Sequence, residues 1–258
     1  MEERKVNSAN GMLWFKQGYW LFKKSPLLWV VLVMIGTLGL IGIASIPVIG
    51  DPLATLLFPV ILGGYMLGSR ALELGEELEL AHLFAGFRQH AQQLVTLGGI
   101  NLVSQLLILG LMKLTGGAAL VEIMMTGMPA DNPAAAALLA QAIRDAGIAL
   151  PLGGILFCVL LLAMQLAPML VIFGKMEPVA ALKTSFQACL RNMGALSVYG
   201  VVILVFGLAA TMAMMLGWIV LLPVMIASMY AIYRDLFPTQ IEDIASGKDE
   251  AATASDQT

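Results

Sequence analysis

Six long apolar stretches constrain the fold of this chain more than any other feature of its sequence. A helix needs about 20 apolar residues to cross the hydrocarbon core of a membrane. Only 12% of the 258 residues are charged, about half the fraction found in soluble domains. The sequence therefore predicts an all-α integral membrane protein with six transmembrane helices, at about 27–47, 53–72, 94–112, 148–173, 195–215 and 217–236.

The connections between neighbouring spans are predicted from length and from turn residues. The last two stretches form one apolar run of about 39 residues, which as a single helix would be about 58 Å long, nearly twice the thickness of the hydrocarbon core. We therefore expect a turn at Leu216 and Gly217. The first two spans are expected to turn at 46–52, because this segment holds two prolines, a glycine and an aspartate.

Lysine and arginine residues are distributed unequally between the two sides of the predicted bundle. If the N-terminus is cytoplasmic, twelve of the fourteen basic residues fall on the cytoplasmic side, and only Lys113 and Arg144 remain outside. Cytoplasmic segments of membrane proteins carry an excess of lysine and arginine. The sequence therefore predicts that both termini are cytoplasmic.

The predicted domain layout is a single membrane domain over 1–237. Its largest external segment is expected at about 115–147, where residues 131–147 predict a helix that Asp131 or Asn132 caps and Gly147 ends. The stretch 238–258 is polar and rich in Asp, Glu, Ala, Ser and Thr. Such a composition predicts a disordered cytoplasmic tail.

Short helical stretches precede the first, third and fifth spans, at 12–26, 80–94 and 178–194. Apolar side chains gather on one face of the second and third stretches, and polar side chains lie opposite. This pattern is typical of amphipathic helices that lie in the headgroup layer of a membrane. The side chains predicted to contact lipid or the membrane surface are Trp14, Lys16, Trp20, Lys23, Lys24, Lys183 and Arg191.

Two distant segments repeat the same pattern of residues. FPVILGGYMLGSR (58–70) and LPVMIASMYAIYR (222–234) both begin with an apolar residue, Pro and Val and end on Arg, and APMLVIFGK (167–175) resembles them more loosely. Together with the amphipathic stretches, they favour a threefold parallel repeat of one interfacial helix and one helical hairpin. The alternative is coincidence, because apolar segments resemble one another easily.

Other motifs of the spans have structural interpretations. Gly64 and Gly68 form a small-residue motif for close helix approach, with packing inside the chain favoured over dimerisation. Arg70, Glu73 and Glu77 are spaced to share one helix face, which predicts a salt-bridged helix end rather than a cation site. The prolines inside the second spans are expected to break or kink their helices: Pro59, Pro168 and Pro223.

Polar residues inside the spans are few. Asn101, Gln105 and Gln165 are candidates to line a substrate path, although hydrogen bonding between helices is the more ordinary role. No ionisable residue lies near the midpoint of a predicted span, which argues against a proton-coupled pump and against an intramembrane hydrolase. We also expect no metal site and no cofactor.

The chain resembles a family of uncharacterised proteobacterial inner-membrane proteins, through WFKQGYWLFKKSPLLWVV (14–31), RALELGEELELAHLFAGF (70–87), AALKTSFQACLRN (180–192) and LPVMIASMYAIYRDLF (222–237). It is more distantly similar to the membrane domain of some glycerophosphodiester phosphodiesterases. The likeness covers most of 12–237 and is weak across 115–147. It implies a six-span protein of the bacterial inner membrane. It carries over no catalytic or binding residue, and no phosphodiesterase catalytic domain is present.

These observations favour a non-enzymatic membrane protein that binds a lipid or a protein partner, with an assembly, scaffold or envelope role. A transporter or lipid translocator with a path between the repeats is the alternative. A homo-oligomer is compatible with either function. The net charge of −3 gives no reason to expect a nucleic-acid partner.

Overall fold

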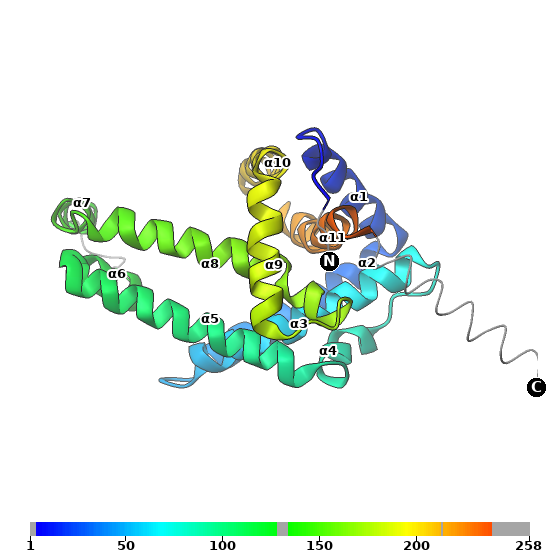
Figure 1. Cartoon of the computed structure of the whole chain (residues 1–258), viewed down its shortest axis with the longest axis horizontal. Helices are drawn as coiled ribbons and strands as arrows, with labels where there is room; N and C mark the ends of the chain where they lie inside the picture. The colour runs from blue at the N-terminus through cyan, green and yellow to red at the C-terminus, as the bar shows by residue number, and fades with distance from the viewer. Residues whose placement is uncertain (1–3, 128–133, 213, 239–258) are drawn as a thin grey trace, which may run out of the picture. The chain divides into compact units, whose positions relative to one another are not determined.

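The computed structural model describes residues 4–127, 134–212 and 214–238 (Figure 1). The predicted tail therefore lies outside the described residues, except for its first position, as do Asp131 and Asn132. Every regular element in the described part is helical. In chain order these are α1 (Asn10–Lys24), α2 (Pro26–Ala44), α3 (Gly50–Glu73), η1 (Leu80–Phe84), α4 (Ala85–Arg88), α5 (Ala91–Met112), η2 (Lys113–Gly117), α6 (Ala118–Thr126), α7 (Ala135–Asp145), α8 (Ala149–Ile172), α9 (Pro178–Arg191), α10 (Met193–Met212) and α11 (Trp218–Leu236).

Six of these helical segments are long and apolar enough to span a membrane, which confirms the predicted fold class. They are α2, α3, α5 continued through α6, α8, α10 and α11. The chain divides into two compact units, a large unit of 1–98 with 163–258 and a small unit of 99–162. Helices α5 and α8 each contribute residues to both.

The two predicted turns are present, with small differences in position. The first turn lies between Ala44 and Gly50, and Pro52 falls in the first turn of α3, where the missing N–H of proline costs nothing. The second lies between Met212 and Trp218. A Cβ atom on Gly217 would lie 2.6 Å from the Cα atom of Ala210, so glycine permits the close approach of α10 and α11.

The helix predicted within 131–147 is present as α7, but a second helix, α6, precedes it in the predicted external segment. Helix α5 continues through the π-helical segment η2 into α6, with Gly116 at a φ of 108°, and α7 is a separate helix. A glycine tolerates this left-handed conformation, so the long helix bends at this point instead of ending. The helices pack around a small apolar core of Met112, Leu120, Val121, Ala142, Ala146 and Ala149.

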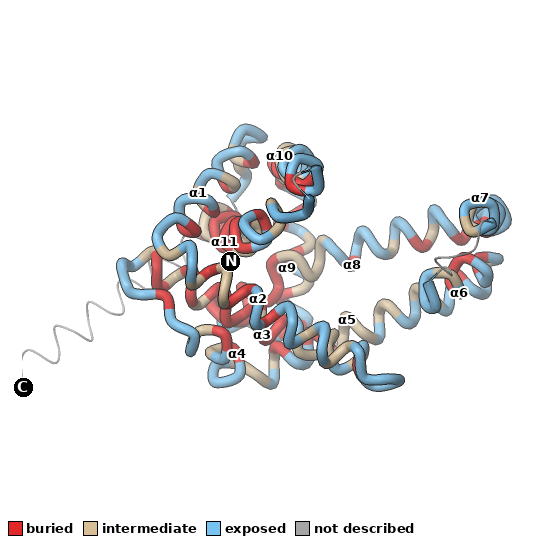
Figure 2. The backbone as a smooth tube through the Cα atoms, turned by 180° about the vertical axis from the view of Figure 1, so that it is seen from behind, coloured by how far each residue is buried: buried red, intermediate tan, exposed pale blue. Residues whose placement is uncertain are grey.

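The second helix of each predicted hairpin changes from exposed to buried along its length (Figure 2). No residue is exposed after Phe58 in α3, after Leu161 in α8 or after Leu222 in α11. Pro59 and Pro223 stand directly at this change, and Pro168 lies within the buried part of α8. We call the three buried segments, 59–73, 162–172 and 223–236, the inner parts of these helices.

The inner parts contact one another inside the large unit. A Cβ atom on Gly63 of α3 would lie 2.5 Å from Cδ1 of Ile172 at the end of α8. The ring of Phe173, directly after α8, lies 5.8 Å from the ring of Tyr230 and 5.4 Å from that of Tyr233 in α11. The three proline-containing helices therefore form one packed core.

The segments predicted to be interfacial pack against these inner parts through small residues. A Cβ atom on Gly18 of α1 would lie 2.7 Å from both the amide nitrogen of Ser228 and the carbonyl oxygen of Val224. Figure 1 accordingly shows α1 beside α11, so the first and last helices of the chain lie together. The amide of Leu166 in α8 donates a 3.0 Å hydrogen bond to the hydroxyl of Ser185 in α9.

The stretch 80–94 differs from the expected single helix. It forms η1 and α4, and α5 then begins at Ala91, after His90 with its positive φ of 56°. A Cβ atom on Gly64 would lie 2.8 Å from the carbonyl oxygen of Leu83. The motif of Gly64 and Gly68 therefore serves packing inside the chain, as expected.

Candidate functional site

The inner ends of α3 and α11 are joined by a charged and aromatic cluster. The carboxylate of Glu73 forms an ion pair with the guanidinium of Arg234 and accepts a 2.6 Å hydrogen bond from the hydroxyl of Tyr230. The guanidinium of Arg70 lies 5.7 Å from the ring centroid of Phe173, within the range of a cation–π interaction. We call this part of the large unit the charged end.

The expectation that Arg70, Glu73 and Glu77 share one helix face is wrong for Glu77, whereas Arg70 and Glu73 both lie in the last turn of α3. Helix α3 ends at Glu73, and Gly75 has a φ of 82°, which turns the chain away before Glu77. Glu73 instead faces Arg234 and Tyr230 of α11. A carboxylate that is mostly buried needs such partners, because an unpaired buried charge costs several kcal/mol.

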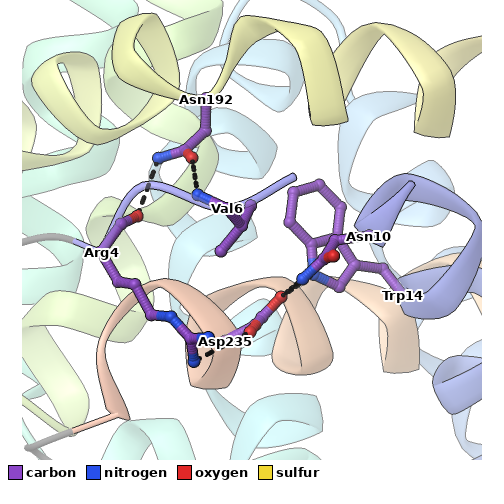
Figure 3. Close-up of polar contacts among 6 residues, drawn as sticks. All are labelled: Arg4, Val6, Asn10, Trp14, Asn192 and Asp235. Carbon is purple, nitrogen blue, oxygen red and sulfur yellow. Dashed lines mark hydrogen bonds and ion pairs between the residues drawn. The ribbon is translucent and has the colours of Figure 1, made fainter. Parts of the chain in front are cut away.

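A second polar cluster fixes the N-terminal segment to α11 (Figure 3). The carboxylate of Asp235 accepts a 2.7 Å hydrogen bond from the side-chain amide of Asn10 and a 2.8 Å hydrogen bond from the indole N–H of Trp14. The guanidinium of Arg4 lies 3.9 Å from the same carboxylate. Asn192 joins this cluster from the other side, since its side-chain oxygen accepts from the amide of Val6 and its nitrogen donates to the carbonyl of Arg4.

A pocket of about 350 Å³ lies beside the charged end, between the last turns of α3 and the segment η1–α4. Its lining combines cationic, anionic and apolar side chains. The charged and polar members are Arg70, Glu76, Glu79, His82, Arg88 and Gln89. We call this cavity the α3 pocket. It differs from an ordinary apolar cleft, because charges of both signs face the same space.

The ring of His82 lies against the backbone of Glu79. Its Nδ1 is 3.0 Å from the backbone nitrogen and 3.2 Å from the carbonyl oxygen of Glu79, and the tautomer of the ring decides which of these contacts is the hydrogen bond. The contact belongs to a capping box at the start of η1, in which the carboxylate of Glu79 accepts from the backbone N–H of His82.

The residues predicted to contact the membrane surface fall into two groups. Trp14 differs from the prediction, because it is fully buried and bonded to Asp235 and so has no surface to offer to lipid. The Nζ atom of Lys24 lies 4.1 Å from the ring centroid of Trp20 and donates a hydrogen bond to the carbonyl oxygen of Leu72. The exposed members of the set are Lys16, Trp20, Lys23, Lys24, Lys183 and Arg191.

The three predicted path residues belong to different units. Asn101 and Gln105 are half-buried in the small unit, and Gln165 is half-buried in the large unit. Gln105 lines a mostly apolar cavity of about 300 Å³, together with Met112, Met124, Phe157 and neighbouring residues of the small unit. Their role as a path remains a prediction.

A comparison with known proteins bears on the identity of the chain. It is 33% identical, over 261 residues, to a probable inner membrane protein of Burkholderia thailandensis; the alignment covers 93% of this chain and 95% of that relative. The chain belongs to this family of inner membrane proteins. No family model and no solved structure matches it. The likeness to the membrane domain of glycerophosphodiester phosphodiesterases therefore stays a prediction from the sequence.

The sequence of this inner membrane protein did not single out Asp235, Asn192, Tyr230 or Arg88. One signal was present for Asp235, which ends an apolar helix. A carboxylate near a helix C-terminus is unfavourable because it faces the negative end of the helix dipole, so a specific partner was to be expected there. Among the described residues, no group of three or more His, Cys, Asp or Glu side chains is placed to hold a metal ion.

Proposed function

We propose that this inner membrane protein is non-enzymatic and acts by binding a lipid or a protein partner in the α3 pocket beside its charged end, in an assembly, scaffold or envelope role. The observation that carries the proposal is the filled packing of the three inner parts. Residues 166–173 are all buried, and Tyr230, Tyr233 and Phe237 are almost completely enclosed. A core of this kind holds a fixed surface in place and leaves little room for a solute to pass.

The chemistry of the carboxylates supports a non-enzymatic role. Glu73 is engaged by Tyr230 and Arg234, and Asp235 is engaged by Asn10 and Trp14. A general acid or base must be within hydrogen-bond reach of the substrate proton. These two carboxylates instead accept hydrogen bonds from within the fold, where they stabilise it.

A transporter or lipid translocator is the second candidate. The apolar cavity that Gln105 lines favours it, because an apolar space with a single amide suits a hydrocarbon chain that carries one polar group. Removing that amide by Gln105→Leu would then reduce ligand binding or movement. The same substitution would leave binding at the charged end unchanged.

We also propose that the three hairpins are copies of one unit, each with an interfacial helix. Equivalent contacts support this. Gly18 packs on Val224 and Ser228 of α11, and Gly86 packs at the carbonyl of Val60 and the amide of Gly64 in α3. In the two repeated segments, Val60 corresponds to Val224 and Gly64 to Ser228. Such contacts are expected when a duplicated hairpin keeps its packing.

The test is purification of the full chain in native lipid discs, followed by mass spectrometry of all protein and lipid that co-purifies. The proposal expects one enriched lipid or one stoichiometric protein, lost in Arg88→Gln and kept in Gln105→Leu. Loss in Gln105→Leu alone would move the function to the transport alternative. Discs with neither an enriched lipid nor a partner would contradict the proposal.

A further inference from the structure

We propose that the α3 pocket binds the headgroup of a phospholipid that carries a primary ammonium group as well as a phosphate. This inference rests on the proposed function and names the ligand of that pocket. It follows from the combination of side chains around the pocket, their hydrogen-bonding capacity and the apolar surface that surrounds them.

The pocket offers complementary charges for both halves of such a headgroup. The guanidinium groups of Arg70 and Arg88 line it together with the carboxylates of Glu76 and Glu79. Guanidinium groups bind phosphate oxygens through two parallel hydrogen bonds. Carboxylates accept hydrogen bonds from an ammonium group, which has three donors and no acceptor. Each half of a zwitterionic headgroup therefore finds a partner of opposite charge.

His82 is a further polar residue in the lining of the pocket. Its Nδ1 lies beside the backbone nitrogen and the carbonyl oxygen of Glu79, and the capping box of η1 holds the ring in place. The charge that binds the phosphodiester, which carries one negative charge, comes from the two guanidinium groups.

The chemistry of the pocket discriminates between headgroups. A headgroup with a phosphate and only hydroxyl groups brings no cation to the two carboxylates and places its own negative charge near them. A quaternary ammonium group has the charge but no N–H to donate to Glu76 and Glu79. A primary ammonium group brings both the charge and the N–H donors, and such a difference between competing complexes is a source of specificity.

The surface beside the pocket favours a lipid over a soluble phosphate compound. The exposed fractions are 52% for Leu74, 50% for Leu80 and 57% for Phe84, and all three side chains belong to the segments that form the pocket. Apolar side chains exposed beside a polar site mark a surface that meets a membrane or another apolar body. In a chain with six apolar spans, that surface suits the interfacial part of a lipid.

The experiment is native mass spectrometry of the purified full chain with added phosphatidylethanolamine, phosphatidylcholine or phosphatidylglycerol of identical acyl chains. We expect phosphatidylethanolamine to bind about tenfold more tightly than the other two, a difference of about 1.4 kcal/mol. Arg88→Gln should weaken the binding of all three lipids, because each of them carries the phosphate that Arg88 is proposed to bind. Glu79→Gln keeps a hydrogen-bond acceptor in place but removes the negative charge. It should therefore reduce the ratio between the affinities for phosphatidylethanolamine and phosphatidylglycerol.

Arg144→Gln is the matched control, because Arg144 is an exposed cation of α7 that does not line the pocket and is not among the side chains predicted to contact lipid. It should bind all three lipids as the parent does. Each variant is first compared with the parent by size-exclusion chromatography and thermal unfolding. Arg88→Lys provides a second measurement if Arg88→Gln fails to fold, since it keeps the charge, loses the two-pronged contact and should bind less tightly.

Equal binding of the three lipids by the parent chain would overturn the inference. Phosphatidylethanolamine binding that Arg88→Gln leaves unchanged would overturn it too, as would a preference over phosphatidylglycerol that Glu79→Gln leaves unchanged. The failure of the inference is distinguishable from that of the proposed function. A different lipid or a protein partner in the native discs would contradict this headgroup while supporting a binding role. Discs with neither would contradict both.

Discussion

The hydroxyl group of Tyr230 donates a 2.6 Å hydrogen bond to the carboxylate of Glu73, a residue 157 positions earlier in the chain. The same carboxylate pairs with Arg234, so one acidic side chain ties the second span to the last. This contact closes the packed core of the large unit at its charged end.

We expect Arg234→Gln to destabilise the protein more than Tyr230→Phe. The loss of Arg234 leaves the Glu73 carboxylate, whose side chain is 21% exposed, without its cation, at a cost of about 3 kcal/mol. Tyr230→Phe keeps the ion pair and the ring packing and should cost about 1.5 kcal/mol. Reversible unfolding in SDS, read by tryptophan fluorescence, measures both. Additive effects of Glu73→Gln and Arg234→Gln in a double-mutant cycle would contradict this coupling.

Trp14→Phe should lower the stability of the large unit. The phenyl ring retains most of the buried apolar surface, but Asp235 loses the 2.8 Å hydrogen bond from the indole, which is worth about 1.5–3 kcal/mol. Trp20→Phe is the matched control, because Trp20 is 52% exposed and should change little. The measurement is thermal unfolding in detergent. A larger effect at Trp20 than at Trp14 would refute the assignment.

Alanine substitutions at close-packed glycines should destabilise the fold. A Cβ atom on Gly18 would lie 2.7 Å from the backbone of Ser228, and one on Gly86 would lie 3.0 Å from the carbonyl carbon of Val60. Overpacking of this kind costs about 1–3 kcal/mol. At Gly42 no atom lies within 4 Å of an added Cβ, so Gly42→Ala should be neutral or stabilising by up to about 1 kcal/mol. Equal effects at the three sites, measured by SDS unfolding, would contradict the packing.

The thiol of Cys189 should resist modification in the folded protein. Burial raises the pKa of this thiol to about 11, and a hydrogen bond with Ser185 offsets a small part of the rise. The thiol of an unfolded cysteine has a pKa near 8.5. The contribution of Cys189 to the free energy of unfolding is therefore fully present below pH 8.5, and it is lost as the pH rises from 8.5 towards 11. In a Cys158→Ser background, maleimide should label Cys189 slowly at pH 7 to 9 and rapidly in SDS. Rapid labelling of the native protein would show that α9 is not docked.

The predicted orientation is testable by labelling from outside the cell. In a background without native cysteines, Leu138→Cys should react with a membrane-impermeant maleimide, because this position of α7 is 48% exposed and is predicted to be external. Lys183→Cys should react only after the membrane is opened, and a C-terminal green fluorescent protein should fluoresce. The opposite pattern would reverse the expected cytoplasmic termini.

Local sequence signals predicted the helices well and the polar contacts poorly. Proline and glycine punctuation located the turn near Pro52, and the small side chains of Gly64 and Gly68 correctly indicated close packing. The prediction for Trp14 failed because an aromatic residue near lysines has the same signature at a membrane surface and in a protein core. Helical spacing placed Arg70, Glu73 and Glu77 on one face, but α3 ends at Glu73 and Gly75 turns the chain before Glu77.

Sequence alone determined the class of this protein, its six spans and their approximate ends. These properties depend on local length and hydropathy, because a chain in a membrane must satisfy its backbone hydrogen bonds within each helix. Tertiary structure decided which polar side chains meet. Asp235 accepts from Trp14 and Glu73 accepts from Tyr230 because helices distant in sequence pack together. Such pairings depend on the docking of whole helices, which the spacing of residues within one helix does not encode.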